Sequence, residues 1–297
     1  MELLSNLSGA LAGIVEATSP SVVRVEARRR FPATGTVWAA EGLIVTADHA
    51  IEHEEHIRVG LPDGRSLAAT LVGRDPTTDI ALLRAETDGL APAAWGDPAS
   101  ARTGHLVLSL GRPGRAVRAR LGVLSAVADN WRAPSGAEIG RYLEVDTGPA
   151  PGFSGGPATN AAGDALGMQT SALLRRASLV VPVTTLRRVV DTLLTYGRVR
   201  RGYLGIGAQP VRLPGRLREE LGQEAGLLLI SVEPGSPAEG AGLLLGDVIL
   251  GFGGGRIYHL QDLMGLLGAD RIGTAMPVRI LRGGVVREMS VVVGERG

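Results

Sequence analysis

The sequence predicts a mostly β fold followed by a smaller mixed unit of strands and helices. Three observations support this prediction: short apolar runs separated by turn residues fill residues 20–182, 43 of the 297 residues are glycine, and the pattern changes after an amphipathic segment near residue 190. Many short strands at such spacing are typical of β-barrels and sandwiches. A chain of 297 residues is long enough for two domains of ordinary size.

The first strands are defined by alternation and by turn residues. "SVVRVEA" (21–27) alternates apolar and polar residues, and "GTVWAAEGLIVTA" (35–47) contains two strands around Glu41-Gly42. "HIRVGLPDGRSLAATLVG" (56–73) reads as a hairpin around Pro62-Asp63-Gly64. Further strands are expected at residues 79–85, 105–111, 117–128, 141–147, 164–171 and 178–183.

A helix is expected at residues 184–197, because five aliphatic residues fall on one face, Thr184 is suited to cap its start, and Gly197 is suited to end it. The polar connector "RVRRG" (198–202) then marks a boundary, which gives domains at 1–200 and 201–297. In the second domain we expect a helix at 260–269 and strands at 226–233, 247–252, 276–282 and 286–293.

Composition excludes several classes of function. A net charge of +1 does not favour a nucleic-acid partner. The absence of cysteine excludes disulfides and metal sites built on thiolates. The N-terminal segment lacks a basic region, and its uncharged run ends at Glu16, so we expect neither a signal peptide nor a membrane anchor. A cytoplasmic location follows, or an exported one if a targeting segment has been removed.

Three short motifs together indicate nucleophilic catalysis by serine. A serine hydroxyl needs a base, an acid that orients the base, and donors for the developing oxyanion. His49 follows an apolar strand in "IVTADHAI", Asp79 begins another in "GRDPTTDIALLR", and Ser154 lies among glycines in "PGFSGGP". Gly152 suits a sharp loop in which its own N–H and that of Ser154 aim at one point. Alone, "PGFSGGP" is also compatible with a purely structural turn.

A zinc site is the rival interpretation of the histidine. Residues 49–53 fit H-x-x-E-H, in which His49 and His53 would bind zinc and Glu52 would act as the base. Such a site needs a long helix and a further ligand, whereas a predicted hairpin begins a few residues later. We therefore expect no metal and no other cofactor.

These motifs resemble those of the HtrA family of trypsin-like serine proteases. The resemblance extends from about residue 15 to the C-terminus through "SPSVVRVEA", "LIVTADHAI", "DPTTDIALLR", "SLGRPG" and "PGFSGGPATNAAGDALGM". "RRGYLGI" and "GLLLISVEPGSPAEGAGLLLGDVILGFGG" are similar to the PDZ domain that follows the protease in that family. The resemblance implies a chymotrypsin/trypsin-like double β-barrel, then one α+β PDZ domain.

The resemblance also implies roles for single residues. His49 would be the general base, Asp79 would orient it, and Ser154 would attack the peptide carbonyl. The amides of Gly152 and Ser154 would form the oxyanion hole. Gly148, six residues before the nucleophile, would lie at the base of the first substrate pocket, and its lack of charge disfavours Arg or Lys there.

In the PDZ domain, Tyr203, Leu204, Gly205 and Ile206 would form the loop that binds a peptide carboxylate. The helix near 260–269 would supply the other wall of the groove, with Leu263, Met264 and Leu267 as candidate lining residues. Asp247 is expected to cap a turn.

The chain departs from the family at Phe153, where the family usually has Asn. Phenylalanine cannot pair with an ammonium group, so no activation by cleavage of a zymogen is expected. The predicted function is ATP-independent cleavage of unfolded or damaged polypeptides through an acyl-enzyme, with C-terminal peptides as PDZ ligands. Family members commonly form trimers through N-terminal aromatic residues, but no aromatic precedes Phe31 here. Phe153 leaves open an alternative: a catalytically silent peptide-binding or chaperone protein.

Overall fold

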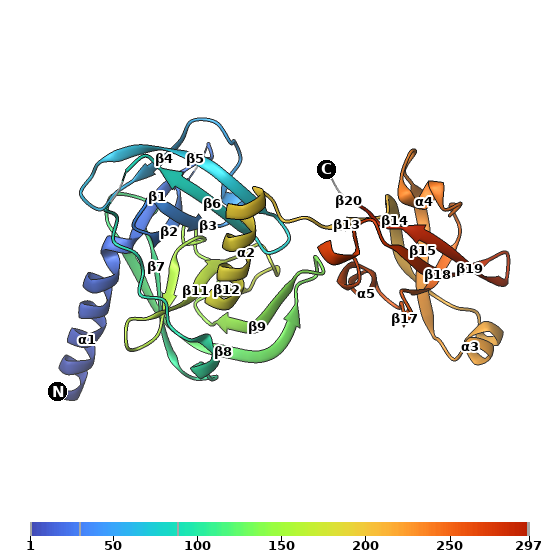
Figure 1. Ribbon diagram of the computed structural model, residues 1–297. Helices are drawn as coiled ribbons and strands as arrows, with labels where there is room; N and C mark the ends of the chain where they lie inside the picture. Colours follow the sequence, from blue (N-terminus) through green and yellow to red (C-terminus); the bar gives the residue numbers. More distant parts are fainter. Residues whose placement is uncertain (1, 30, 88, 296–297) are drawn as a thin grey trace. The chain divides into compact units, whose positions relative to one another are not determined.

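The computed structural model describes residues 2–29, 31–87 and 89–295. The chain divides into two compact units, one made of Met1–Ala133 with Glu138–Val199 and the other of Pro134–Ala137 with Arg200–Gly297. The first unit contains two closed antiparallel barrels of six strands each, and the second contains a β-sheet with short helices (Figure 1). The predicted mostly β fold is confirmed.

The first barrel is formed by residues 22–85. Its hydrogen-bonded order is β1-β2-β3-β6-β5-β4, closed by pairing of β4 with β1. The strands are β1 (Val22–Glu26), β2 (Ala33–Ala39), β3 (Leu43–Thr46), β4 (Ile57–Gly60), β5 (Ser66–Asp75) and β6 (Ile80–Ala85). Every strand of the sequence prediction in this region is present, because each has turn residues at its ends and alternating or buried apolar residues between them.

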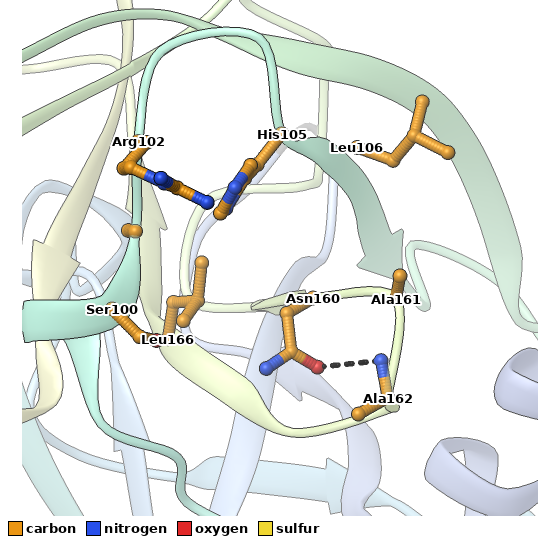
Figure 2. A pocket seen from close by; sticks show the side chains of 9 residues that line it. Ser100, Arg102, His105, Leu106, Asn160, Ala161, Ala162 and Leu166 are labelled. Atoms are coloured by element: carbon orange, nitrogen blue, oxygen red, sulfur yellow. Dashed lines mark hydrogen bonds between the residues drawn. The ribbon is translucent and has the colours of Figure 1, made fainter.

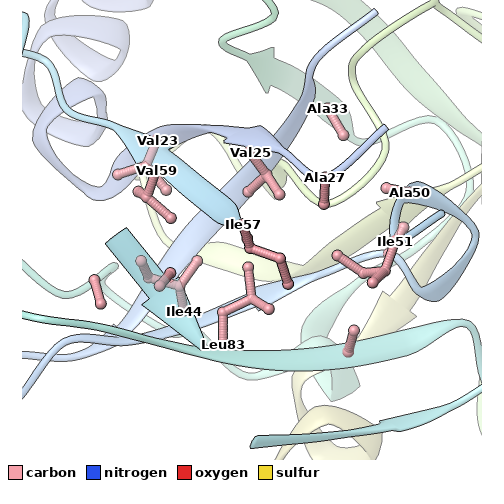
Figure 3. Packing of buried hydrophobic residues seen from close by; sticks show 14 of the residues in the cluster. Val23, Val25, Ala27, Ala33, Ile44, Ala50, Ile51, Ile57, Val59 and Leu83 are labelled. Atoms are coloured by element: carbon pink, nitrogen blue, oxygen red, sulfur yellow. The ribbon is translucent and has the colours of Figure 1, made fainter. Parts of the chain in front are cut away.

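Small aliphatic side chains fill this barrel (Figure 3). Val23 and Val25 of β1 point inward with Ile44 of β3 and Ile57 of β4, and none of the four is more than 1% exposed. Aromatic residues make up only 3% of the sequence, so Val, Ile, Leu and Ala provide the packing. Their close packing fixes the end of β3 and the start of β6. His49 follows the first of these points and Asp79 directly precedes the second.

The second barrel has the order β10-β11-β12-β9-β8-β7 and is also closed. Its strands are β7 (Leu106–Gly111), β8 (Arg118–Arg132), β9 (Glu138–Val145), β10 (Pro157–Thr159), β11 (Ala165–Thr170) and β12 (Ser178–Pro182). The sequence did not reveal β10, because three residues are too few to show a period. The chain reaches β10 directly from the segment that contains Ser154.

Two longer helices belong to the first unit. Helix α2 (Val183–Tyr196) begins one residue earlier than predicted, after Pro182 and not after a Thr184 cap, and ends at Gly197, whose φ of 70° suits glycine. Helix α1 (Glu2–Thr18) was not predicted and buries only Thr18. None of the helices in the described part of the chain has the length and apolar character needed to cross a bilayer. Short 3-10 turns lie at Ser19–Ser21, Asp48–Ala50, Pro98–Ser100 and Ala269–Arg271.

The second unit is built on the sheet β14-β15-β16-β18-β19, with β17 paired to β16 and a separate ladder of β13 and β20. The strands are β13 (Gly202–Tyr203), β14 (Ile206–Arg212), β15 (Ala225–Val232), β16 (Val248–Phe252), β17 (Gly255–Arg256), β18 (Ala275–Arg282), β19 (Val285–Val292) and β20 (Gly294–Glu295). The helices are α3 (Gly215–Leu221), α4 (Pro237–Gly240) and α5 (Leu260–Gly265).

Two local predictions in this unit have clear outcomes. The helix expected at 260–269 is shorter than predicted, because α5 ends at Gly265 and a 3-10 turn follows at Ala269–Arg271. Asp247 does cap a turn: its carboxylate accepts a 2.8 Å hydrogen bond from the N–H of Leu244 and also binds Arg282. Burial acts to raise the pKa of Asp247, but these bonds outweigh it and hold the pKa below its ordinary value.

Candidate active site

The three residues of the predicted triad lie on three separate elements of the first unit. His49 lies on the 3-10 turn Asp48–Ala50 that follows β3, and Asp79 directly precedes β6. Ser154 lies on the loop before β10 of the second barrel. His49 and Ser154 line the same cavity, of about 440 Å³, together with Arg28, Phe31, Glu52, Pro149, Ala150, Pro151, Gly152 and Ser171.

Asp79 orients the imidazole ring of His49. Its Oδ1 and Oδ2 each lie 2.9 Å from the Nδ1 of His49, and Oδ1 also accepts the backbone N–H of His49 at 2.9 Å. The Thr170 hydroxyl donates to Oδ2. The side chain of Asp79 is 3% exposed, whereas that of His49 is 31% exposed. A carboxylate held by three donors fixes Nδ1 as the protonated nitrogen and leaves Nε2 as an acceptor.

The loop around Ser154 has two backbone donors for which the described part of the chain offers no acceptor. The amides of Phe153, Gly155 and Gly156 each donate to a carbonyl, whereas those of Gly152 and Ser154 have no acceptor among the residues that the structure describes. Gly152 and Gly155 have φ of 80° and 91°, which other residues rarely adopt. Two unpaired N–H groups two residues apart, beside a cavity, are suited to an anionic oxygen.

Thr34 of the first barrel attaches this loop to the rest of the unit. Its hydroxyl donates to the carbonyl of Gly152 at 2.6 Å, and its N–H donates to the carbonyl of Ser154 at 3.2 Å. A Cβ on Gly155 would lie 1.9 Å from the carbonyl oxygen of Thr34, so only glycine fits there. The loop is therefore held between the two barrels.

The hydroxyl of Ser154 itself contacts a neighbouring serine. The Oγ of Ser154 lies 3.3 Å from the Oγ of Ser171, which directly follows β11, and the two hydroxyl groups form a hydrogen bond. Ser154 is 7% exposed. Neither Thr170, the last residue of β11, nor Ser171 after it could be recognised from the sequence, since neither belongs to a motif of its own. Only the position of β11 beside the loop brings them to the site.

The predicted carboxylate loop of the second unit lies between β13 and β14. Gly205 has φ of 76°, and a Cβ there would lie 2.2 Å from the Cβ of Ser236. The carbonyls of Leu204 and Gly205 accept hydrogen bonds from Ala238 and Glu233, whereas their N–H groups have no acceptor in the described part of the chain. Tyr203 donates its hydroxyl to Glu233, and Ile206 begins β14.

The neighbouring helix contributes less to a groove than predicted. Leu263 and Leu267 are 1% and 6% exposed and belong to the core of the unit, so they pack inward. Met264 is partly buried.

Comparisons with known proteins agree with both halves of this picture. The trypsin-like peptidase domain matches residues 33–168, and the PDZ domain matches residues 202–293. A probable periplasmic serine endoprotease DegP-like of Halomonas elongata is 32% identical over 275 residues, which cover 90% of this chain and 57% of the relative. A putative serine protease HhoB of Synechocystis is 29% identical and is covered to 66%. The chain thus spans little more than half the length of several curated relatives.

Solved structures extend the similarity to the whole fold. An HtrA-type protease AlgW with decapeptide superposes with a TM-score of 0.75 at 26% identity, covering 96% of this chain and 98% of that one. A serine endoprotease from Yersinia pestis gives a TM-score of 0.75 at 27% identity with the same coverage. The chain belongs to the HtrA family of trypsin-like serine endopeptidases with a C-terminal PDZ domain.

The family relatives correct one prediction. The sequence pointed to the cytoplasm, but relatives from Halomonas elongata, Chlamydia trachomatis and Marinomonas are all named periplasmic endoproteases. The cytoplasmic prediction is therefore wrong. It rested on the lack of a recognisable targeting segment, and such a lack says little about a chain that spans only part of its relatives.

Phe153, the departure from the family pattern, is not among the residues that line the cavity. The residue is 7% exposed, so its aromatic side chain is buried. It packs on Gly111 at the end of β7, where an added Cβ would lie 2.9 Å from the Cγ of the ring. Gly148 also does not line the cavity; it has φ of 64°, and its carbonyl lies 3.4 Å from the Arg120 guanidinium. Its role in substrate selection stays a prediction.

The segment of the zinc alternative does not form the helix that such a site needs. Residues 48–50 make one 3-10 turn, and residues 52–56 form no helix. The Nδ1 of His53 bonds the carbonyl of Glu55 at 2.7 Å. Across the described ranges, no group of three or more His, Asp or Glu side chains is placed to hold a metal ion.

A second cavity of about 470 Å³ lies on the second barrel (Figure 2). Arg102 and His105 lie beside each other on one side of it, and Asn160 and Leu166 lie on the other. It is somewhat larger than the cavity of His49 and Ser154. It has no serine paired with an oriented base, because the Ser100 hydroxyl donates to the carbonyl of Asp97 at 2.9 Å. Size alone therefore does not identify the site of chemistry.

Proposed function

We propose that this chain is an ATP-independent serine endopeptidase that cleaves unfolded or damaged polypeptides through an acyl-enzyme. The protease domain comprises residues 1–200 and the PDZ domain residues 201–297. Ser154 is the nucleophile, His49 the general base and Asp79 the residue that orients it. The pairing of Asp79 with Nδ1 of His49, beside a cavity that Ser154 also lines, is the observation that carries this proposal.

The geometry supports the following steps. Nε2 of His49 takes the proton of the Ser154 hydroxyl as Oγ attacks the peptide carbonyl, and the imidazolium then gives that proton to the leaving amine. The unpaired amides of Gly152 and Ser154 stabilise the oxyanion. Water, activated by the same nitrogen, hydrolyses the resulting ester. Before attack, the hydroxyl has to turn from Ser171 toward His49.

Covalent labelling tests this proposal directly. A fluorophosphonate probe forms a stable ester only with an activated serine, so the wild-type protein should be labelled at pH 7.5 while Ser154→Ala should not. His49→Ala should lower the rate by about 1,000-fold or more, because the hydroxyl then has no base. Equal signal from the wild type and Ser154→Ala would refute the protease proposal.

The PDZ domain is proposed to bind the C-terminal carboxylate of substrate or regulatory peptides. The N–H groups of Leu204 and Gly205, which have no acceptor among the described residues, support this role, since backbone donors in such a loop bind a carboxylate. A related structure, the HtrA-type protease AlgW, is described with a decapeptide. A fluorescent peptide with a free C-terminus should therefore bind, and its C-terminal amide should bind at least about 10-fold more weakly.

A catalytically silent peptide-binding protein is the second candidate. The contact between Ser154 and Ser171 favours it, because this contact competes with a hydrogen bond to His49. The labelling experiment separates the two candidates: a silent protein would bind the free-acid peptide but would show no Ser154-dependent labelling.

The proposal includes an exported location, which the periplasmic names of the relatives support. It also includes a homotrimer. Helix α1 exposes Leu3, Leu4 and Leu7, which are 81%, 71% and 43% exposed. These leucines offer apolar surface for self-association in place of aromatic residues. Sedimentation equilibrium of the full chain should give three times the chain mass, and Leu4→Ser with Leu7→Ser should lower it.

A further inference from the structure

Arg74, at the end of β5, binds the turn that carries His49. Its Nε donates to Oδ1 of Asp48 at 2.5 Å, and its Nη2 lies 3.3 Å from the carbonyl oxygens of both Asp48 and Ile51. Its Nη1 reaches the carboxylate of Glu54 at 3.2 Å. One guanidinium thus contacts both the start and the end of residues 48–54, the segment that contains His49.

The partner of Arg74 is a buried carboxylate. Asp48 is 7% exposed, and within the described part of the chain its carboxylate has the guanidinium of Arg74 as its hydrogen-bond partner. The hydrogen bond with Asp48 is the main reason that the pKa of Arg74 is raised above its usual value, so the cation persists at every pH of interest. A buried carboxylate without this cation would be costly and would loosen the turn.

We propose that Arg74 is a positioning residue for His49, which fixes the histidine turn and neutralises the carboxylate of Asp48, the residue that precedes His49 in this turn. This inference rests on the proposed function, since it assumes that His49 is the base. The backbone N–H of Asp48 also donates to the carbonyl of Asp79 at 3.2 Å, so the same turn aligns His49 with its orienting acid. Arg74 touches neither the cavity nor Ser154 and acts through Asp48.

The electrostatic part of the proposal has a definite sign. Arg74→Gln leaves the carboxylate of Asp48 without its cation, and an uncompensated negative charge favours protonated His49. The pH at which reactivity reaches half its maximum should therefore rise. Asp48→Asn leaves a positive charge and should shift the midpoint downward. Across a partly buried turn, each shift should be about half to one pH unit.

Other charged groups face His49, and they are the same in every variant. Asp79 contacts the ring, and Arg28 and Glu52 line the same cavity. Their contributions cancel when variants are compared with the wild type. The difference in pH midpoint between Arg74→Gln and Asp48→Asn thus reports on the pair Arg74 and Asp48.

The experiment measures the second-order rate constant of fluorophosphonate labelling from pH 5 to 9. The variants are Arg74→Gln, Arg74→Lys, Asp48→Asn and the double variant Asp48→Asn with Arg74→Gln. Arg84→Gln, an exposed residue on the adjacent strand β6, is the control that removes the same charge elsewhere on the barrel. Tryptophan fluorescence verifies that each variant is folded, and all three tryptophans lie in the first unit.

Arg74→Gln should react about 10-fold more slowly at pH 7 with a higher midpoint, and the double variant should return the midpoint close to that of the wild type. Arg74→Lys should retain the wild-type midpoint while losing part of the rate, because lysine keeps the charge but not the planar array of donors. An unchanged midpoint in both folded single variants would overturn the role of Arg74. A wild type labelled no faster than Ser154→Ala would instead overturn the proposed function.

Discussion

Phe153 is expected to hold the loop of Ser154 by packing, and removing its ring tests this. The ring is 7% exposed and lies against the backbone of Gly111, so Phe153→Ala removes a buried aromatic side chain next to the nucleophile. Truncation of a buried phenylalanine costs about 3–5 kcal/mol. Urea unfolding followed by tryptophan fluorescence measures this cost in the first unit alone, because no tryptophan lies outside it. Phe31→Ala is a matched control for stability, since Phe31 is 65% exposed and its removal should cost under about 0.5 kcal/mol.

The reciprocal change is Gly111→Ala. The new Cβ would lie 2.9 Å from Cγ of Phe153, so either the ring or strand β7 has to move. Such overpacking typically costs about 1–3 kcal/mol. In the double variant the added methyl group enters space vacated by the ring, so its total cost should be at least about 1 kcal/mol less than the sum of the single costs.

The same variants also report on function. Phe153 lies between the two residues whose free amides face the developing oxyanion in the proposed mechanism, so loosening it should lower the labelling rate of Ser154 by about 10-fold or more. Strictly additive costs in the double variant would refute this reasoning. So would a Phe153→Ala protein that is labelled at the wild-type rate and loses under about 1 kcal/mol of stability, about a third of the expected minimum.

Three further predictions concern other parts of the chain. Asp79→Asn should lower the labelling rate by about 10,000-fold, because the amide stabilises the wrong tautomer of His49; a loss below 10-fold, far under the roughly 10,000-fold expected, would contradict the orienting role. Gly205→Ala should weaken binding of a free-acid peptide by about 10-fold or more in fluorescence anisotropy, since the new Cβ would lie 2.2 Å from Cβ of Ser236; unchanged affinity would contradict this. The pKa of Asp247 is lowered from 3.8, so its contribution to stability is present above that pH and is lost as the pH falls through the folded-state pKa; calorimetry should show that Asp247→Asn destabilises the second unit at pH 7 by about 2–4 kcal/mol and removes part of its acid sensitivity.

Local patterns account for the parts of the structure that the sequence predicted well. Every strand of the first barrel could be located, because alternation and turn residues act over a few neighbours. The short strand β10, helix α1 and the end of α5 were missed or misplaced. Three residues carry no period, and α1 buries only Thr18, so no buried apolar face marks it in the sequence. The location was also predicted wrongly, because it depends on signals outside the fold.

The sequence by itself determined which residue types are available for chemistry: a serine among glycines, and a histidine and an aspartate that each adjoin an apolar strand. The tertiary structure alone decided which atoms meet. Arg74 binds Asp48 across 26 residues, and Thr34 binds Gly152 across 118 residues. Phe153 meets Gly111 instead of the cavity. The physical reason is that such contacts arise when two barrels close and pack, and the distance between side chains is then set by strand register and by the packing of both barrels, not by neighbours along the chain.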